Sequence, residues 1–155
     1  GVSLSGNLSG AGKVSGQAQG SGTGITVSGR VDGGELNGAS VNGTGAQVTD
    51  GATVSSSSIS GTSTAGTGTV VSNGSSVTDV TVSGSSDTGT GTQWGNNVTN
   101  NNVTIAGQST SGSGVHLDTG TTLTNSTVKG KTESGRGVDV TGNLTNAGSS
   151  TVTGT

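Results

Sequence analysis

The sequence has no cysteine, proline, methionine, phenylalanine or tyrosine, and one tryptophan among its 155 residues. Without cysteine, disulfide bonds cannot hold the fold. With Trp94 as the one aromatic side chain, the chain has almost none of the aromatic surface on which sugar-cleaving enzymes stack their substrates. Neither a disulfide scaffold nor a glycan-cleaving enzyme is therefore favoured.

Charge and apolar residues are also scarce. Five Lys and Arg against eight Asp and Glu give a net charge of −3, which offers no basic patch for nucleic acid. No apolar run approaches the roughly 20 residues that cross a bilayer, so we expect no membrane insertion of this segment. No signal peptide pattern opens the sequence, and we expect any export signal to lie outside it.

Thirty-three glycines are present, and many recur as G-x-G doublets at a nearly fixed interval. The doublets begin 21 residues apart and then 23 residues apart four times. A fixed period of this length is typical of a solenoid, whereas a flexible Gly/Ser/Thr linker needs no register. The doublets are Gly22/Gly24, Gly43/Gly45, Gly66/Gly68, Gly89/Gly91, Gly112/Gly114 and Gly135/Gly137.

Apolar residues keep their place relative to these doublets and form columns. Directly after the second glycine come two columns one residue apart: Val2, Ile25, Ala46, Thr69, Thr92, Val115, Val138, and Leu4, Val27, Val48, Val71, Trp94, Leu117, Val140. The next column, seven or nine residues after the glycine, is Leu8, Val31, Val54, Val77, Val98, Leu123, Leu144. The last is Val14, Leu36, Ile59, Val82, Ile105, Val128, Val152, each followed two residues later by glycine. Alternation of this kind predicts short strands with one buried face.

The repeat therefore predicts an all-β fold, a single-stranded parallel β-helix with about 23 residues per coil, three short strands per coil and roughly 6–7 coils. Antiparallel hairpins are disfavoured because the columns repeat without mirroring. We expect residues 1–155 to form one β-helix segment, a fragment of a longer repeat array, because no capping segment is visible at either end.

Three repeat units resemble the β-helical shafts of filamentous-haemagglutinin-like exoproteins of two-partner secretion and the passengers of autotransporter adhesins. They are "GTGTVVSNGSSVTDVTVSGSSDT" (66–88), "GSGVHLDTGTTLTNSTVKGKTES" (112–134) and "GRGVDVTGNLTNAGSSTVTGT" (135–155). The resemblance implies a right-handed helix on the surface of a Gram-negative bacterium, extracellular and exported through an outer-membrane transporter. It implies a rigid stalk for cell attachment or aggregation, with a host-cell or bacterial surface protein or glycan as partner. It also implies glycosylation of the Asn-x-Ser/Thr sites, which are Asn7, Asn42, Asn73, Asn97, Asn102, Asn125 and Asn143.

His116, the only histidine, is the strongest candidate for chemistry. Strand alternation places it on an outward position, with Asp118 on the same face and Asp139 one coil away. An acid/base pair or a weak metal site is one interpretation, and a solvated histidine among carboxylates is the favoured one. We assign no catalytic residue, cofactor or metal, and the glycine doublets lack the lysine and the following helix of a phosphate loop.

Two further features have open interpretations. Trp94 lies in an inward column, so we expect it in the core, although a slip in strand parity would expose it for binding. The segment 96–102, NNVTNNN, predicts either a stacked asparagine turn or a protruding loop.

The alternative to an adhesive stalk is a repeat surface that binds a regular lattice or polymer, either ice or a polysaccharide. The pairs Thr67/Thr69 and Thr90/Thr92 hint at the threonine ladder of an ice binder, although Ile25, Ala46 and Val115 interrupt it.

Overall fold

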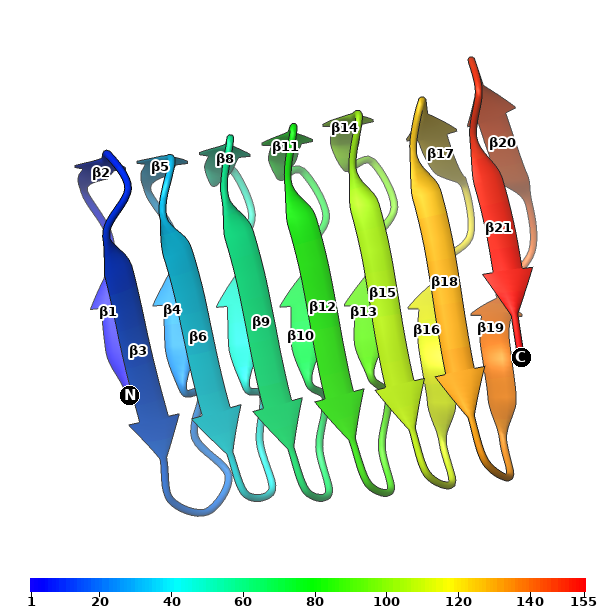
Figure 1. Cartoon of the computed structure of the whole chain (residues 1–155), viewed down its shortest axis with the longest axis horizontal. Helices are drawn as coiled ribbons and strands as arrows, with labels where there is room; N and C mark the ends of the chain where they lie inside the picture. The colour runs from blue at the N-terminus through cyan, green and yellow to red at the C-terminus, as the bar shows by residue number, and fades with distance from the viewer.

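The computed structural model describes all 155 residues and contains strands and turns only. Three strands make up each coil, and seven coils stack side by side along one axis, with the two chain ends at opposite ends of the stack (Figure 1). We number the coils in chain order, so that coil 1 holds β1–β3 and coil 7 holds β19–β21. All pairing between coils is parallel, which confirms the predicted β-solenoid.

The strands form three faces. Face 1 is a seven-stranded sheet of β1 (Val2–Leu4), β4 (Ile25–Val27), β7 (Ala46–Val48), β10 (Thr69–Val71), β13 (Thr92–Trp94), β16 (Ser113–Leu117) and β19 (Arg136–Val140). Face 3 is a seven-stranded sheet of β3 (Lys13–Ala18), β6 (Glu35–Ser40), β9 (Ser58–Ser63), β12 (Thr81–Ser86), β15 (Thr104–Ser109), β18 (Thr127–Thr132) and β21 (Thr151–Gly154).

Face 2 is the exception, because its strands form two sheets. Five strands pair in one sheet: β2 (Asn7–Ser9), β5 (Arg30–Asp32), β8 (Thr53–Ser55), β11 (Ser76–Thr78) and β14 (Thr99–Asn101). The other two, β17 (Thr121–Thr124) and β20 (Leu144–Ala147), pair only with each other. The break therefore lies between coil 5 and coil 6.

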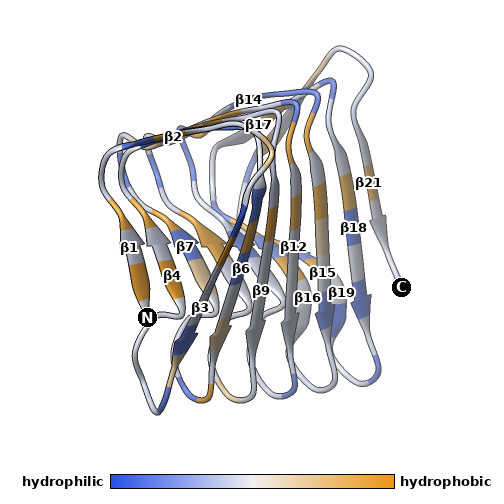
Figure 2. Ribbon diagram, turned by 60° about the vertical axis from the view of Figure 1, so that its left-hand side comes forward, coloured by the Kyte–Doolittle hydropathy of each residue, from blue (hydrophilic) through white to orange (hydrophobic).

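The core is the interior of the coil stack, where 21 buried residues form one apolar cluster. The predicted first columns pair in register along face 1, so Ile25 lies beside Ala46 and Val27 beside Val48. The predicted last column pairs in register along face 3, as in Leu36 beside Ile59. In Figure 2 the apolar segments of neighbouring strands line up along the axis. Strand alternation thus turns these columns toward the interior.

The predicted face 2 column is wrong in coils 5 and 7. Val77 pairs with Asn100 and not with Val98, and Leu144 pairs with Thr121 and not with Leu123. Val98 and Leu144 lie two residues earlier in their coils: Val98 directly precedes β14, and Leu144 is the first residue of β20. A shift of two residues keeps side-chain parity, so Val98 is still buried, with 6% of its surface exposed.

The glycine doublets lie at the corner between face 3 and face 1, as the sequence predicts. A Cβ on Gly66 would lie 2.0 Å from the carbonyl oxygen of Gly43, one coil earlier. A Cβ on Gly68 would lie 2.4 Å from the main-chain nitrogen of Ser85. Both distances are far below van der Waals contact, so the corner admits no side chain. The doublet therefore sets how closely face 1 approaches face 3.

The turn between face 2 and face 3 carries a column of residues with positive φ. Asp79, Asn102 and Asn125 have φ between 46° and 55° in coils 4, 5 and 6. Asparagine and aspartate tolerate this region better than other residues with a Cβ. The Nδ2 of Asn102 donates to Oδ1 of Asp79 at 2.7 Å, so the stacked side chains bond from coil to coil.

Candidate functional surfaces

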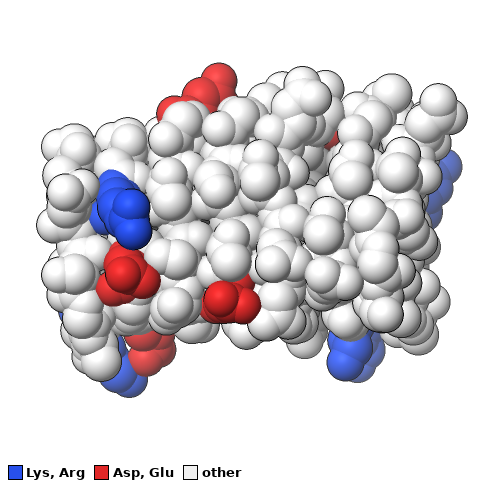
Figure 3. All heavy atoms as spheres, turned by 90° about the horizontal axis from the view of Figure 1, so that it is seen from above, with Lys and Arg blue, Asp and Glu red and all other residues white.

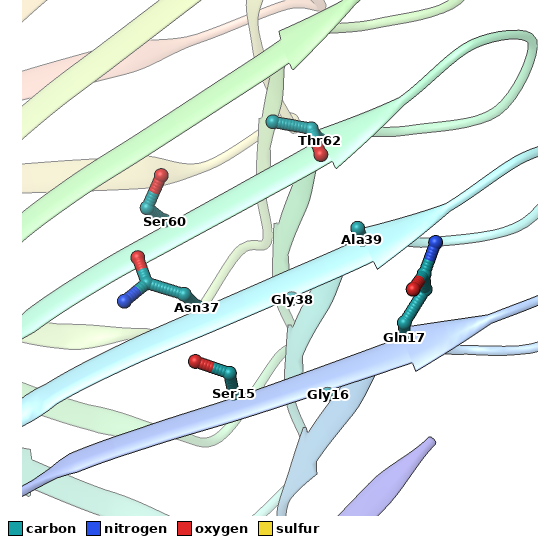
Figure 4. Close-up of a pocket in the computed structure, with 8 residues that line it drawn as sticks. All are labelled: Ser15, Gly16, Gln17, Asn37, Gly38, Ala39, Ser60 and Thr62. Atoms are coloured by element: carbon teal, nitrogen blue, oxygen red, sulfur yellow. The ribbon is translucent and has the colours of Figure 1, made fainter.

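A shallow groove runs over the outer side of face 3. One part of it has a volume of about 450 Å³ and crosses coils 1–3 (Figure 4). One wall is the row Ser15, Asn37, Ser60, and the other is the row Gln17, Ala39, Thr62. A second hollow of about 200 Å³ shares Ser60 and Thr62 and continues over coils 3–5. The groove therefore runs along the axis.

Glycine forms the floor of this groove. Gly16 and Gly38 lie between the two walls in Figure 4, and their α-carbons face the interior. A Cβ on Gly38 would lie 2.0 Å from the carbonyl oxygen of Gly45, so this column is glycine because face 1 packs directly beneath it. We did not single out the residues of the two walls from the sequence. Strand parity and the fixed position of the glycine could have predicted that these residues point outward on either side of it.

The groove is uncharged over its central coils. Charged side chains stand at its two ends: Lys13 and Glu35 in coils 1 and 2, and Lys129 and Lys131 in coil 6. Lys13 Nζ and Glu35 Oε2 are 2.8 Å apart. The hydrogen bond from Lys13 lowers the pKa of the Glu35 carboxyl, and the same bond raises the pKa of Lys13. Figure 3 shows how sparse charge is on another side of the molecule, where single charged residues stand in a largely uncharged surface.

His116 lies between the two carboxylates that the sequence places beside it. Its Nδ1 is 3.1 Å from Oδ2 of Asp139, and its Nε2 is 3.2 Å from Oδ1 of Asp118. Arg136 Nη1 donates to the other oxygen of Asp139 at 3.2 Å. The two carboxylates meet opposite ring nitrogens and do not converge on one point. This arrangement links coil 6 to coil 7.

Trp94 is fully buried, which confirms the expected core position. Its Nε1–H has no hydrogen-bond partner, an uncommon state for a buried donor. Thr92, two residues earlier on the same inward side of β13, is fully buried too, and its hydroxyl donates to the carbonyl of Ala106. The small neighbour leaves space for the indole in coil 5.

The hint of a threonine ladder is wrong, because two of its four members point inward. Thr69 and Thr92 are both 0% exposed. Each hydroxyl donates to a main-chain carbonyl of face 3, that of Ser83 for Thr69 and that of Ala106 for Thr92. The hydroxyls of these threonines form hydrogen bonds inside the molecule, so these residues cannot present a flat outer row to a lattice.

The segment 96–102 forms a turn and a bend on either side of β14, and its inward members are Val98 and Asn100. Asn97 and Asn102 adopt positive φ in exposed turns, while Asn100 is buried at 5% exposure. The sequence contained a signal for Asn100. The face 2 inward residue precedes the face 3 column by five residues in coils 2, 3, 4 and 6, and counting back from Ile105 reaches position 100.

The seven predicted glycosylation sites are all exposed: Asn7, Asn42, Asn73, Asn97, Asn102, Asn125 and Asn143. Five lie in turns or bends, Asn143 directly precedes β20, and Asn7 begins β2. The amides of Asn102 and Asn125 already donate to Asp79 and Asn101 of the preceding coil. Glycosylation of these sites remains a prediction.

No family model, no curated protein and no solved structure matched this chain. The structure contains no helix with the length and apolarity needed to span a membrane.

Proposed function

We propose that this chain is a non-enzymatic, rigid segment of a secreted bacterial surface adhesin, and that it mediates attachment or aggregation outside the cell. The observation that carries the proposal is the in-register stacking of seven coils around one continuous core. A core shared by all coils resists bending, which suits a stalk. The resemblance of its repeats to adhesin shafts supports the same role.

Attachment would use side chains that point outward, and these are mainly hydroxyls and amides. Such a surface stays hydrated without strong charge, so it suits contact with a glycan or a polar protein surface more than with nucleic acid. The partners we propose are a host-cell or bacterial surface protein or glycan, with an outer-membrane transporter acting during export.

The test is attachment of beads coated with residues 1–155 to host cells and to bacteria. We expect coated beads to attach above the level of beads that carry the chain unfolded by Val82→Asp. Equal attachment of the two preparations on every surface would overturn the adhesive role. Release of reducing ends from a polysaccharide panel would overturn the non-enzymatic assignment.

A polysaccharide binder is the second candidate, and the face 3 groove is the observation that favours it. The groove is open at the surface, runs along the axis and is lined by hydroxyls and amides, as an extended neutral polymer requires. Co-sedimentation with insoluble neutral polysaccharides tests it. Thr62→Lys should weaken sedimentation, while Thr53→Lys on face 2 of the same coil should not. With Thr69 and Thr92 turned inward, we expect no thermal hysteresis.

A further inference from the structure

Coil 5 interrupts the aliphatic inward column of face 2. The face 2 column is aliphatic in coils 1–4 and in coil 6, but in coil 5 it is Asn100. The same coil holds Trp94, whose buried Nε1–H has no partner. Positions that break an otherwise consistent pattern are where function is expected, because they give up stability that the pattern would supply.

The side-chain amide of Asn100 stands between coil 5 and coil 6. Its Nδ2 donates to the carbonyls of Val98, at 3.1 Å, and Thr122, at 2.6 Å. Its Oδ1 accepts from the Thr124 N–H at 2.9 Å. These three bonds use both donors and one lone pair of the amide. The Asn100 side chain thus forms hydrogen bonds with main-chain groups of both coils.

The Asn100 amide interrupts the main-chain hydrogen bonding of face 2 between β14 and β17. One coil earlier, the Thr99 N–H donates to the carbonyl of Ser75 at 2.9 Å, as a parallel ladder requires. At the next step the corresponding carbonyl, that of Val98, is bonded to the Asn100 amide, and β17 belongs to a different sheet from β14. The main chain of Asn100 is left without its ladder partners on the β17 side.

A hollow of about 400 Å³ lies over this opening, and we call it the seam cleft. Its lining consists of Asn97, Val98, Thr99, Asn100, Gly120, Thr122 and Thr124. No charged residue lines it, and the one apolar member, Val98, is itself buried. The volume falls within the range of about 300–1,000 Å³ that small-molecule sites occupy.

We propose that the seam cleft binds one sugar unit of a neutral glycan. A sugar ring carries hydroxyls that both donate and accept, which matches the threonine hydroxyls and the Asn97 amide of the lining. An ionic ligand would find no opposite charge there. An extended peptide would need a free strand edge and apolar side-chain pockets, and the Asn100 amide already fills the edge. This site is separate from the face 3 groove and does not depend on the adhesive role.

The experiment is a ¹⁵N–¹H correlation titration of residues 1–155 with glucose, galactose and mannose in turn. We expect saturable shifts of the Asn97, Thr99, Thr122 and Thr124 amides with one or more of these sugars. Thr122→Val removes one exposed hydroxyl and should weaken binding about fivefold, the effect of losing one hydrogen bond of about 1 kcal/mol. Thr62→Val, a matched change in the face 3 groove, should leave the affinity unchanged.

Asn100→Val supplies the second test. Valine is the residue of this column in coil 4, so the variant should join β14 to β17, close the seam cleft and abolish the shifts. Because Thr122 is exposed, Thr122→Val remains informative if Asn100→Val does not fold. The proposal is overturned if no sugar gives saturable shifts at the four amides, or if Thr122→Val binds as tightly as the unchanged chain. Bead attachment measured on Thr122→Val tells loss of this site apart from failure of the adhesive role.

Discussion

The hydroxyl of Ser63 donates a 2.8 Å hydrogen bond to the carbonyl of Gly43 in the preceding coil. The same oxygen accepts from the N–H of Gly66, 2.9 Å away in its own coil. Ser40, Ser86, Ser109 and Thr132 repeat this pair of bonds in other coils. In each of coils 2–6, one hydroxyl therefore ties the first glycine of a doublet to the first glycine of the preceding one.

Ser63→Ala should destabilise the chain by about 1–3 kcal/mol, because it removes two part-buried hydrogen bonds. Ser63→Thr should cost less, since Thr132 makes the same two bonds in coil 6. The measurement is the urea midpoint by circular dichroism. Thr62→Ala changes the exposed neighbour on the same strand and is the control. A midpoint for Ser63→Ala equal to that of Thr62→Ala would contradict a structural role for the hydroxyl.

Val82→Asp should abolish folding of the stack. Val82 is 0% exposed and lies between Ile59 and Ile105 of the neighbouring coils, so aspartate would place a charge in an apolar interior without a partner. Far-ultraviolet circular dichroism should lose its β signal. Ser83→Asp, one residue later on the outer side, should keep it. If Val82→Asp melts like the unchanged chain, the assignment of inward columns is wrong.

Most of the architecture could be predicted from the sequence because two physical rules leave few choices. Strand alternation fixes which residues face inward, and the glycine doublets admit no side chain where the coil turns. These rules place Ile25, Leu36 and Val82 correctly. They assign Val98 in place of Asn100 to the face 2 column, because an apolar residue is preferred over a polar one for a core position. Only the full set of bonds to the Asn100 amide shows why a polar side chain is tolerated there.

The candidate sites were less predictable, because they depend on distances between coils. The sequence placed His116 near Asp118 and Asp139, but the carboxylates' positions on opposite ring nitrogens follow from side-chain geometry. The threonine pairs failed for a related reason. A threonine ladder requires hydroxyls that point outward, whereas Thr69 and Thr92 bury theirs by donating to the carbonyls of face 3. A polar residue in an inward column is compatible with the fold wherever a main-chain partner is within reach.

Trp94 offers a spectroscopic test, because it is the only aromatic fluorophore. A fully buried indole should emit at short wavelength and resist quenching by acrylamide until the chain unfolds. Denaturation in urea should shift the emission to that of a hydrated indole in the same transition that abolishes the circular dichroism signal. Emission at the wavelength of a hydrated indole in the folded chain would contradict the core position and support exposure of Trp94 for binding.

The exposed pair of Lys13 and Glu35 predicts a small, defined pH dependence. Because Lys13 lowers the pKa of the Glu35 carboxyl below 4.5, the ionised form stabilises the folded chain. This contribution is present above the unfolded-state pKa and is lost as the pH falls through the folded-state value. The pKa of Lys13 is raised above 10.5, so its contribution is present below that pH and is lost as the pH rises through the raised value.

Lys13→Gln should return the Glu35 pKa toward 4.5 in a carboxyl-detected NMR titration, whereas Lys131→Gln, at the far end of face 3, should not change it. An unchanged Glu35 pKa in Lys13→Gln would show that the pair does not persist in solution, as solvent screening permits for exposed ions.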